Sequence, residues 1–132
     1  MFYEIKLTVT KPNDKGVERE VKEHYLVNAE LFGEAEMKGL NEYNGECDVT
    51  NIIRSRIREI VNQKEEEKPF FKATIVSVYL NDDGSEKEMK YPVLVCAEDV
   101  QKATEIINRY MKEGLDDMRL DKVELTKIID VL

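Results

Sequence analysis

Several residue types that commonly carry catalysis and metal binding are scarce in this sequence of 132 residues. The chain has one histidine, two cysteines, three serines and no tryptophan. Most nucleophile and base pairs, and most zinc sites, need histidine or cysteine in larger numbers. The composition therefore predicts a protein that is not an enzyme, with no catalytic residue, no cofactor and no metal site.

The two cysteines and the apolar segments also limit the class of protein. Cys47 and Cys96 lie far apart and neither has a second cysteine at CxxC spacing, so we expect reduced thiols. No stretch approaches the roughly 20 apolar residues that a membrane-spanning helix needs. Residues 1–6 show no basic segment followed by an apolar one, so we expect no signal peptide and a cytoplasmic protein.

Negative charge predominates, with 28 acidic against 20 basic residues and a net charge of -8. The two halves, residues 1–66 and 67–132, contribute equally to it. Such a protein repels nucleic acid and anionic membranes except where positive side chains cluster. The apolar fraction of 42% is too high for a disordered chain, and the length suits one domain.

An internal duplication is indicated when the chain is compared with itself at an offset of 68 residues. Twelve of the 44 positions from 2 to 45 are then identical, including Asn13, Asp14 and Gly16 against Asn81, Asp82 and Gly84. Unrelated segments would share about three, and collinear similarity at a fixed offset is typical of repeated units. Two hairpins with convergent turns are the alternative interpretation.

The sequence pattern of each copy predicts two strands, then a helix, then a closing strand. Apolar and polar residues alternate over positions 3–10, and Asn13–Gly16 and Asn81–Gly84 predict tight hairpin turns. In the first copy a helix is predicted next, with Asn28 as its N-cap, Asn44–Gly45 as its stop and a stripe at helical spacing formed by Phe32, Ala35, Gly39 and Tyr43. Pro92 predicts a sheet edge or a bulge.

The closing segments show a second offset, of 71 residues. Residues 120–132 favour a strand, whereas residues 49–61 fit either a strand or a helix. We predict a strand there because its duplicate has that pattern. The fold class is therefore α+β: two β-β-α-β repeats, residues 2–61 and 70–132, joined by the charged connector 62–69. They pack as one pseudo-twofold domain with mainly antiparallel sheet.

Short segments of both copies resemble a family of small proteins catalogued as a domain of unknown function. The resemblance rests on the aromatic-led first strand and on Tyr25–Ala29, Glu34–Glu36, Asp48–Ile52 and Glu59–Ile60. Phe2-Tyr3 and Phe70-Phe71 stand where a tryptophan would open each copy. Because such proteins occur in gut Bacteroidetes and in their phages and mobile elements, the resemblance implies a bacterial intracellular protein of phage ancestry, and it supplies no catalytic residue.

Other polar groups have structural interpretations. The turns at Asn13-Asp14 and Asn81–Asp83 lack the alternating carboxylates of a calcium loop and are interpreted as hairpin turns. The aspartates at 116, 117 and 121 are interpreted as a solvated loop. His24, the only imidazole, is interpreted as a structural or surface residue because no partner for catalysis is evident.

The candidate binding residues are Arg54, Arg56 and Arg58, a positive row in an acidic protein. On a strand, alternate side chains project from one face about 6.6–7 Å apart, which suits consecutive phosphates of an extended nucleic acid. The alternative interpretation pairs them with carboxylates such as Glu18 and Glu20 on neighbouring strands.

These features predict a noncatalytic binding or adaptor protein of phage or mobile-element origin that acts through protein–protein contacts. The alternative function is binding of single-stranded nucleic acid, or of an anionic nucleotide, through Arg54, Arg56 and Arg58. No membrane partner is expected.

Overall fold

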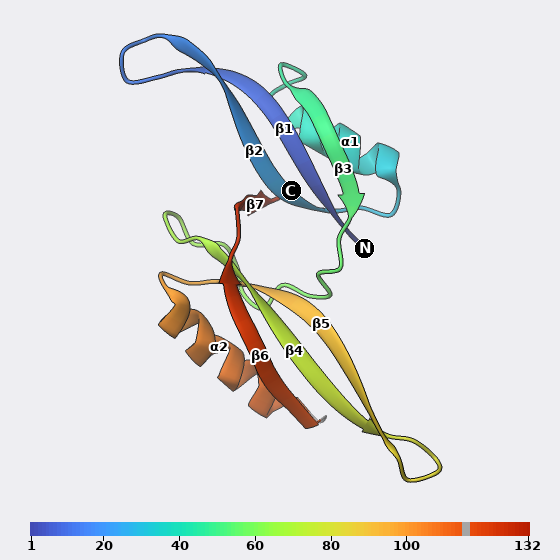
Figure 1. The fold of residues 1–132 in the computed structure, drawn as a ribbon. Helices are drawn as coiled ribbons and strands as arrows, with labels where there is room; N and C mark the ends of the chain where they lie inside the picture. Colours follow the sequence, from blue (N-terminus) through green and yellow to red (C-terminus); the bar gives the residue numbers. More distant parts are fainter. Residues whose placement is uncertain (115–116) are drawn as a thin grey trace. The chain divides into compact units, whose positions relative to one another are not determined.

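The chain forms two compact units in the computed structural model, which describes residues 1–114 and 117–132 (Figure 1). Unit 1 comprises Met1–Ser55 and Lys127–Leu132, and unit 2 comprises Arg56–Thr126. The last six residues thus belong to the unit that begins the chain. The expectation of a single domain made of both repeats stays a prediction.

Unit 1 is a four-stranded sheet with a helix on one face (Figure 1). Its elements are β1 (Phe2–Pro12), β2 (Glu18–Asn28), α1 (Phe32–Asn41), β3 (Asp48–Arg54) and β7 (Ile128–Val131). The strand order is β3-β1-β2-β7. Strand β1 is antiparallel to both of its neighbours, whereas β7 runs parallel to β2.

The core of unit 1 follows the predicted alternation. Tyr3, Ile5, Leu7 and Val9 are buried, whereas the residues between them are half-buried or exposed. Helix α1 meets this face through two small buried residues, Ala35 and Gly39. A Cβ at Gly39 would overlap Cδ1 of Ile5 and lie 3.3 Å from Cδ2 of Leu7, so the close approach of helix and sheet depends on glycine there.

Unit 2 has a three-stranded antiparallel sheet, also with a helix on one face (Figure 1). Its elements are β4 (Phe70–Leu80), β5 (Glu86–Cys96), α2 (Val100–Glu113) and β6 (Asp117–Leu125), with strand order β5-β4-β6. Pro92 lies on β5, at the predicted edge of this ladder. Ala103 and Ile107 are the buried residues of α2.

Both predicted hairpin turns are confirmed. The side-chain oxygen of Asn13 accepts hydrogen bonds from the backbone N–H groups of Lys15 and Val17, each at 2.9 Å. Gly16 and Gly84 adopt φ of 78° and 85°, which an L side chain rarely tolerates. The turn residues therefore specify which strands are adjacent.

The predicted start of the first helix is wrong. Strand β2 continues through Asn28, and the helix begins at Phe32 with Leu31 at the N-cap position, where no side chain caps it. Asn28 is held in the sheet because its N–H donates to the carbonyl of Leu132 at 3.3 Å. The favourable capping chemistry of Asn28 is outweighed by pairing with a distant segment.

The closing segments also differ from the prediction. Strand β3 ends at Arg54, and only Ile60 forms a further bridge, parallel to Leu94, so neither a helix nor a continuous strand spans 49–61. In the second half, β6 and β7 are separate strands. Thr126 and Lys127 separate them, and the N–H and hydroxyl of Thr126 both donate to the Phe70 carbonyl, at 3.0 and 2.8 Å.

The α+β class is confirmed, with more sheet than helix. The sheets are not purely antiparallel, because the pairing of β2 with β7 and the bridge at Ile60 are parallel. Both parallel contacts bring together segments far apart in the sequence, which periodicity alone does not reveal.

Candidate functional site

The predicted binding arginines lie where β3 ends and unit 2 begins. Arg54 is the last residue of β3 in unit 1, Arg56 and Arg58 belong to unit 2, and all three are exposed. They do not form a row on one strand face, since pairing with β1 stops at Arg54. Their role in binding stays a prediction.

The interpretation that these arginines pair with carboxylates has no support among residues 1–114 and 117–132. None of the three guanidinium groups forms an ion pair within this part of the chain, including with Glu18 or Glu20. Arg58 instead lies over the ring of Tyr91, 4.5 Å from its centroid. Such stacking orders a guanidinium group without neutralising it.

The segment that follows Arg58 attaches to the edge of β5 in unit 2. The Arg58 N–H donates to the Pro92 carbonyl at 2.9 Å, and the Val61 N–H donates to the Leu94 carbonyl at 2.8 Å. In return, the Leu94 N–H donates to the Glu59 carbonyl at 2.9 Å. The edge of β5, which contains Pro92, is thereby covered by residues 58–61 of the same unit.

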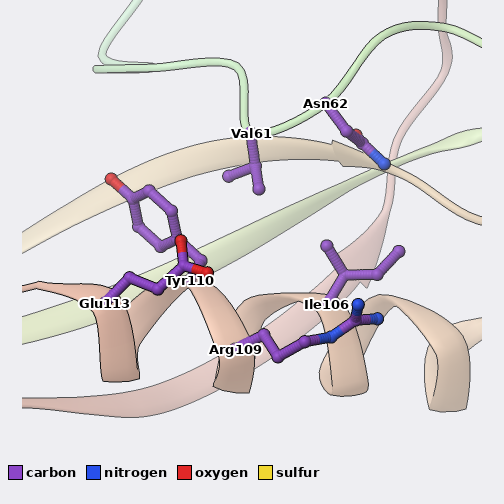
Figure 2. Close-up of a pocket in the computed structure, with 6 residues that line it drawn as sticks. All are labelled: Val61, Asn62, Ile106, Arg109, Tyr110 and Glu113. Atoms are coloured by element: carbon purple, nitrogen blue, oxygen red, sulfur yellow. The ribbon is translucent and has the colours of Figure 1, made fainter.

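A pocket of about 340 Å³ opens between this segment and α2 (Figure 2). It is lined by Val61, Asn62, Ile106, Arg109, Tyr110 and Glu113. Asn62 is fixed by two hydrogen bonds to the backbone of Cys96: its amide donates to the carbonyl at 2.8 Å, and its oxygen accepts from the N–H at 2.7 Å. The Asn62 side chain is therefore held in one orientation at the pocket wall.

The polar groups of the pocket differ in how firmly they are held. The Tyr110 hydroxyl donates to Oε2 of Glu59 at 2.9 Å, and burial together with that carboxylate raises the pKa of Tyr110 to about 12. The side chains of Arg109 and Glu113 are exposed, and both line the pocket (Figure 2). Together the lining residues offer a small polar molecule an amide, a phenol hydroxyl, a guanidinium group and a carboxylate.

A buried carboxylate in unit 1 forms a second polar cluster, which sequence reasoning missed. Glu23 is 8% exposed and accepts hydrogen bonds from Tyr25 and from Lys11, both at 3.0 Å, and from the Tyr43 hydroxyl. Burial alone would raise the pKa of Glu23, but these three donors outweigh it and hold the pKa below its usual value. Burial raises the pKa of Tyr25 most, and the neighbouring side chains of Tyr43 and Glu23 raise it further.

The Glu23 cluster has a structural rather than a chemical role. Lys11 on β1, Tyr25 on β2 and Tyr43, which follows α1, all donate hydrogen bonds to the carboxylate. It is therefore a buried charge whose hydrogen bonds are satisfied. The alternation of inward and outward positions along the strand was the signal in the sequence: Glu23 lies opposite Leu7, on the same face of the sheet as the core. A carboxylate at an inward position predicts nearby donors.

Exposed apolar residues gather at α1. Leu31 is 65% exposed, Phe32 54% and Met37 56%. On α2, Val100, at 51%, is the one large hydrophobic residue with comparable exposure among the described positions of that helix. Met37 lies five positions after Phe32, about 140° around the helix from it, so the two face different sides of α1. We call the chain neighbours Leu31 and Phe32 the α1 surface. Apolar residues that cluster on a surface mark contact sites more often than isolated ones do.

The two helices also start differently. The carboxylate of Asp99 caps α2 by accepting a hydrogen bond from the Lys102 N–H at 2.8 Å. In α1 the same position holds Leu31, which cannot accept that bond and projects to solvent. A capping side chain commonly contributes about 1 kcal/mol of stability. Leu31 therefore lowers the stability of its own helix while exposing an apolar group.

The remaining predicted features have structural surroundings. Nε2 of His24 lies 3.2 Å from Oε1 of Glu4, a neighbour on β1. Both thiols are free. Asp117 begins β6, whereas Asp116 lies outside the described residues. In residues 1–114 and 117–132, no three His, Cys, Asp or Glu side chains are grouped as metal ligands, and neither helix is long and apolar enough to cross a membrane.

Comparison with known proteins assigns the chain to a family. The sequence model of the family described as "Domain of unknown function (DUF4494)" matches residues 1–132, so the chain belongs to this family. No curated protein and no solved structure matches the chain.

Proposed function

For a chain of this family, we propose a noncatalytic binding or adaptor role, exercised through protein–protein contacts. The α1 surface is the observation that carries this proposal. Leu31 and Phe32, neighbours at the start of α1, are 65% and 54% exposed. Large exposed apolar side chains lower solubility, so their concentration on one element favours a contact surface.

The uncapped start of α1 strengthens the proposal. At the equivalent place on α2, an aspartate caps the helix and leaves its start polar. A leucine there forgoes about 1 kcal/mol of capping stability without gaining burial in its own unit. Residues that reduce stability in the free protein are typical of surfaces that serve binding.

A single variant separates binding from folding. We expect Leu31→Asp to supply the missing cap, raise the free energy of unfolding by about 1 kcal/mol and weaken partner binding. Leu80→Asp is the matched control, because Leu80 is 77% exposed at the far end of β4 in unit 2. Tagged full-length wild type and both variants would be used for affinity purification from the native host, with quantitative mass spectrometry.

The proposal requires that proteins retained by wild type and by Leu80→Asp are lost with Leu31→Asp. Each recovered protein would then be purified and titrated against the three chains by calorimetry. If a recovered protein binds wild type and both variants with equal affinity, the α1 surface does not take part in binding. A substrate turned over by the purified chain would contradict the noncatalytic role.

Binding of single-stranded nucleic acid or of an anionic nucleotide is the second candidate function. It is supported by three exposed guanidinium groups that form no ion pair within the described residues, with Arg58 stacked on Tyr91. Fluorescence anisotropy with a labelled dT20 oligonucleotide would show affinity that falls as salt rises. Replacement of Arg54, Arg56 and Arg58 by alanine should abolish it, and no binding by wild type at 50 mM salt would eliminate this candidate.

An internal duplication is part of the proposal. It is supported by hairpin registers that correspond at the offset of 68, since Tyr3 pairs with Val27 as Phe71 pairs with Val95. The register shifts toward β3 and β6 also occur at corresponding places, after Lys6 and after Thr74. A bacterial, intracellular setting with phage or mobile-element ancestry is proposed from the resemblance alone.

A further inference from the structure

We infer that the α1 surface binds a basic protein, in which positive side chains surround an apolar hollow that accepts Leu31 and Phe32. This inference rests on the binding function proposed above and adds the class of partner. It follows from the charges that surround the apolar residues and from the way in which Phe32 is held.

The exposed residues beside the α1 surface are acidic. Glu30, Glu34 and Glu36 are all exposed, within the same seven residues as Leu31 and Phe32. Lys38 is the single basic residue of α1, and its Nζ donates to the backbone carbonyl of Asn28 at 2.5 Å. That contact directs the positive charge toward the end of β2, so negative charge predominates around the apolar side chains.

The apolar anchor is partly ordered before any partner arrives. The Phe32 ring contacts the ring of Tyr3, with centroids 4.8 Å apart and planes inclined at 59°. The Tyr3 hydroxyl donates to the Glu30 carbonyl at 3.2 Å, and the Glu30 N–H donates to Oε2 of Glu34 at 3.2 Å. These contacts restrain the chain that enters α1. An anchor that is ordered in advance loses less conformational entropy on binding.

Charge also decides between the classes of occupant. Two copies of this chain would each bring a net charge of -8, and both would present glutamates at the contact. A nucleic acid would meet the same repulsion. A protein with lysine or arginine around an apolar hollow satisfies both features of the surface, because apolar anchors inside a charged rim are the common anatomy of protein interfaces.

Site-specific cross-linking tests the location. The photoreactive residue p-benzoylphenylalanine would replace Phe32 in the full-length chain and, as a matched control, Val100. Each is the first residue of its helix, and they are 54% and 51% exposed. After illumination in the native host, mass spectrometry would identify the proteins joined to each position. We expect a basic protein joined at position 32 and not at position 100.

Charge reversal then tests the chemistry on the purified pair. Replacement of Glu30, Glu34 and Glu36 by lysine should reduce the association rate constant at least tenfold at 50 mM salt, and by much less at 500 mM. The control replaces three exposed glutamates elsewhere, Glu20, Glu66 and Glu86, and so changes the net charge equally. The net charges match, but the first variant also loses the hydrogen bond from the Glu30 N–H to Glu34. Because salt screens charge and does not restore that bond, a difference between the variants that is present at 50 mM and disappears at 500 mM reports the location of the glutamates.

The outcomes separate this inference from the function on which it rests. An acidic partner at position 32, or equal effects of the two reversals, would overturn the basic partner while leaving protein binding intact. Cross-links confined to position 100 would overturn the location. If neither position joins any protein, the inference and the proposed function both fail.

Discussion

The buried carboxylate of Glu23 should make the stability of unit 1 depend on pH. The proposed change is Glu23→Gln, which keeps the size and shape of the side chain but removes its charge. In the wild type, Glu23 is 8% exposed and accepts hydrogen bonds from Lys11, Tyr25 and Tyr43. Glutamine retains one acceptor oxygen and turns an NH2 group toward donors that need an acceptor.

The expected loss follows from the number and the kind of these bonds. A hydrogen bond to a charged group contributes about 1.5–3 kcal/mol net, and one left without its acceptor costs about 1–3 kcal/mol. Lys11 is 44% exposed, so solvent screening reduces its share. The two tyrosine hydroxyls remain as the main contributors. We expect Glu23→Gln to lower the free energy of unfolding at pH 7 by about 2–3 kcal/mol.

The sign of the pH dependence follows from the direction of the pKa shift. The pKa of Glu23 in the folded state lies below its usual value of 4.5, because the donors outweigh the effect of burial. The contribution of the carboxylate is therefore fully present above about pH 4.5, and it is lost as the pH falls through the folded-state pKa. The difference in free energy of unfolding between wild type and Glu23→Gln should be constant from pH 6 to 8 and should shrink below pH 4.5.

Urea unfolding followed by far-ultraviolet circular dichroism would measure this difference, since the chain has no tryptophan for fluorescence. Glu20→Gln is the matched control, because Glu20 is exposed on the same strand as Glu23 and should change stability by less than about 0.5 kcal/mol. Tyr43→Phe removes one donor and should produce a smaller loss. A Glu23→Gln variant as stable as the wild type, or an equal loss at pH 7 and pH 3.5, would refute this account of the cluster.

Three further results are expected from the packing, the β5 edge and the pocket. Gly39→Ala should lower the free energy of unfolding by about 1–3 kcal/mol, because the added Cβ meets side chains of the β1 core. Gly33→Ala, whose added Cβ meets nothing within 4 Å, should raise it by up to about 1 kcal/mol. Equal effects of the two variants in urea denaturation would contradict this packing. Asn62→Ala should cost about 1–2 kcal/mol by the same assay and speed amide exchange at the end of β5, and unchanged exchange would show that its two hydrogen bonds are dispensable. Ultraviolet titration of Tyr110 should give a pKa of about 12 that falls in Glu59→Gln, and a pKa that stays unchanged in the variant would show that the carboxylate is not its cause.

The strands of each hairpin could be predicted because their signals are local. Alternation over residues 3–9 and the turn at Asn13–Gly16 each depend on neighbours within a few positions, and the structure reproduces both. Asn28 shows the limit of such reasoning. Its side chain suits an N-cap, but the C-terminal Leu132 pairs with its backbone and keeps it in β2.

The candidate site was less accessible to sequence reasoning. The arginine row assumed that a strand continued past Arg54, yet the chain leaves the ladder there and its next bridge is to β5. The pocket beside α2 combines Asn62 with Arg109, which are distant in the sequence. The α1 surface was missed because Phe32 suited the apolar stripe of the predicted helix, and the pattern did not show that only Ala35 and Gly39 would be buried in α1.

By itself, the sequence determined the α+β class, the hairpins, the acidic charge and the shortage of catalytic residue types. These properties depend on composition and on interactions between near neighbours in the chain. The tertiary structure alone decided that β7 joins the sheet of unit 1, that Glu23 has three donors and that Leu31 and Phe32 remain exposed. Each of these depends on which distant segments meet, because burial and pairing are properties of the assembled unit and not of a local pattern.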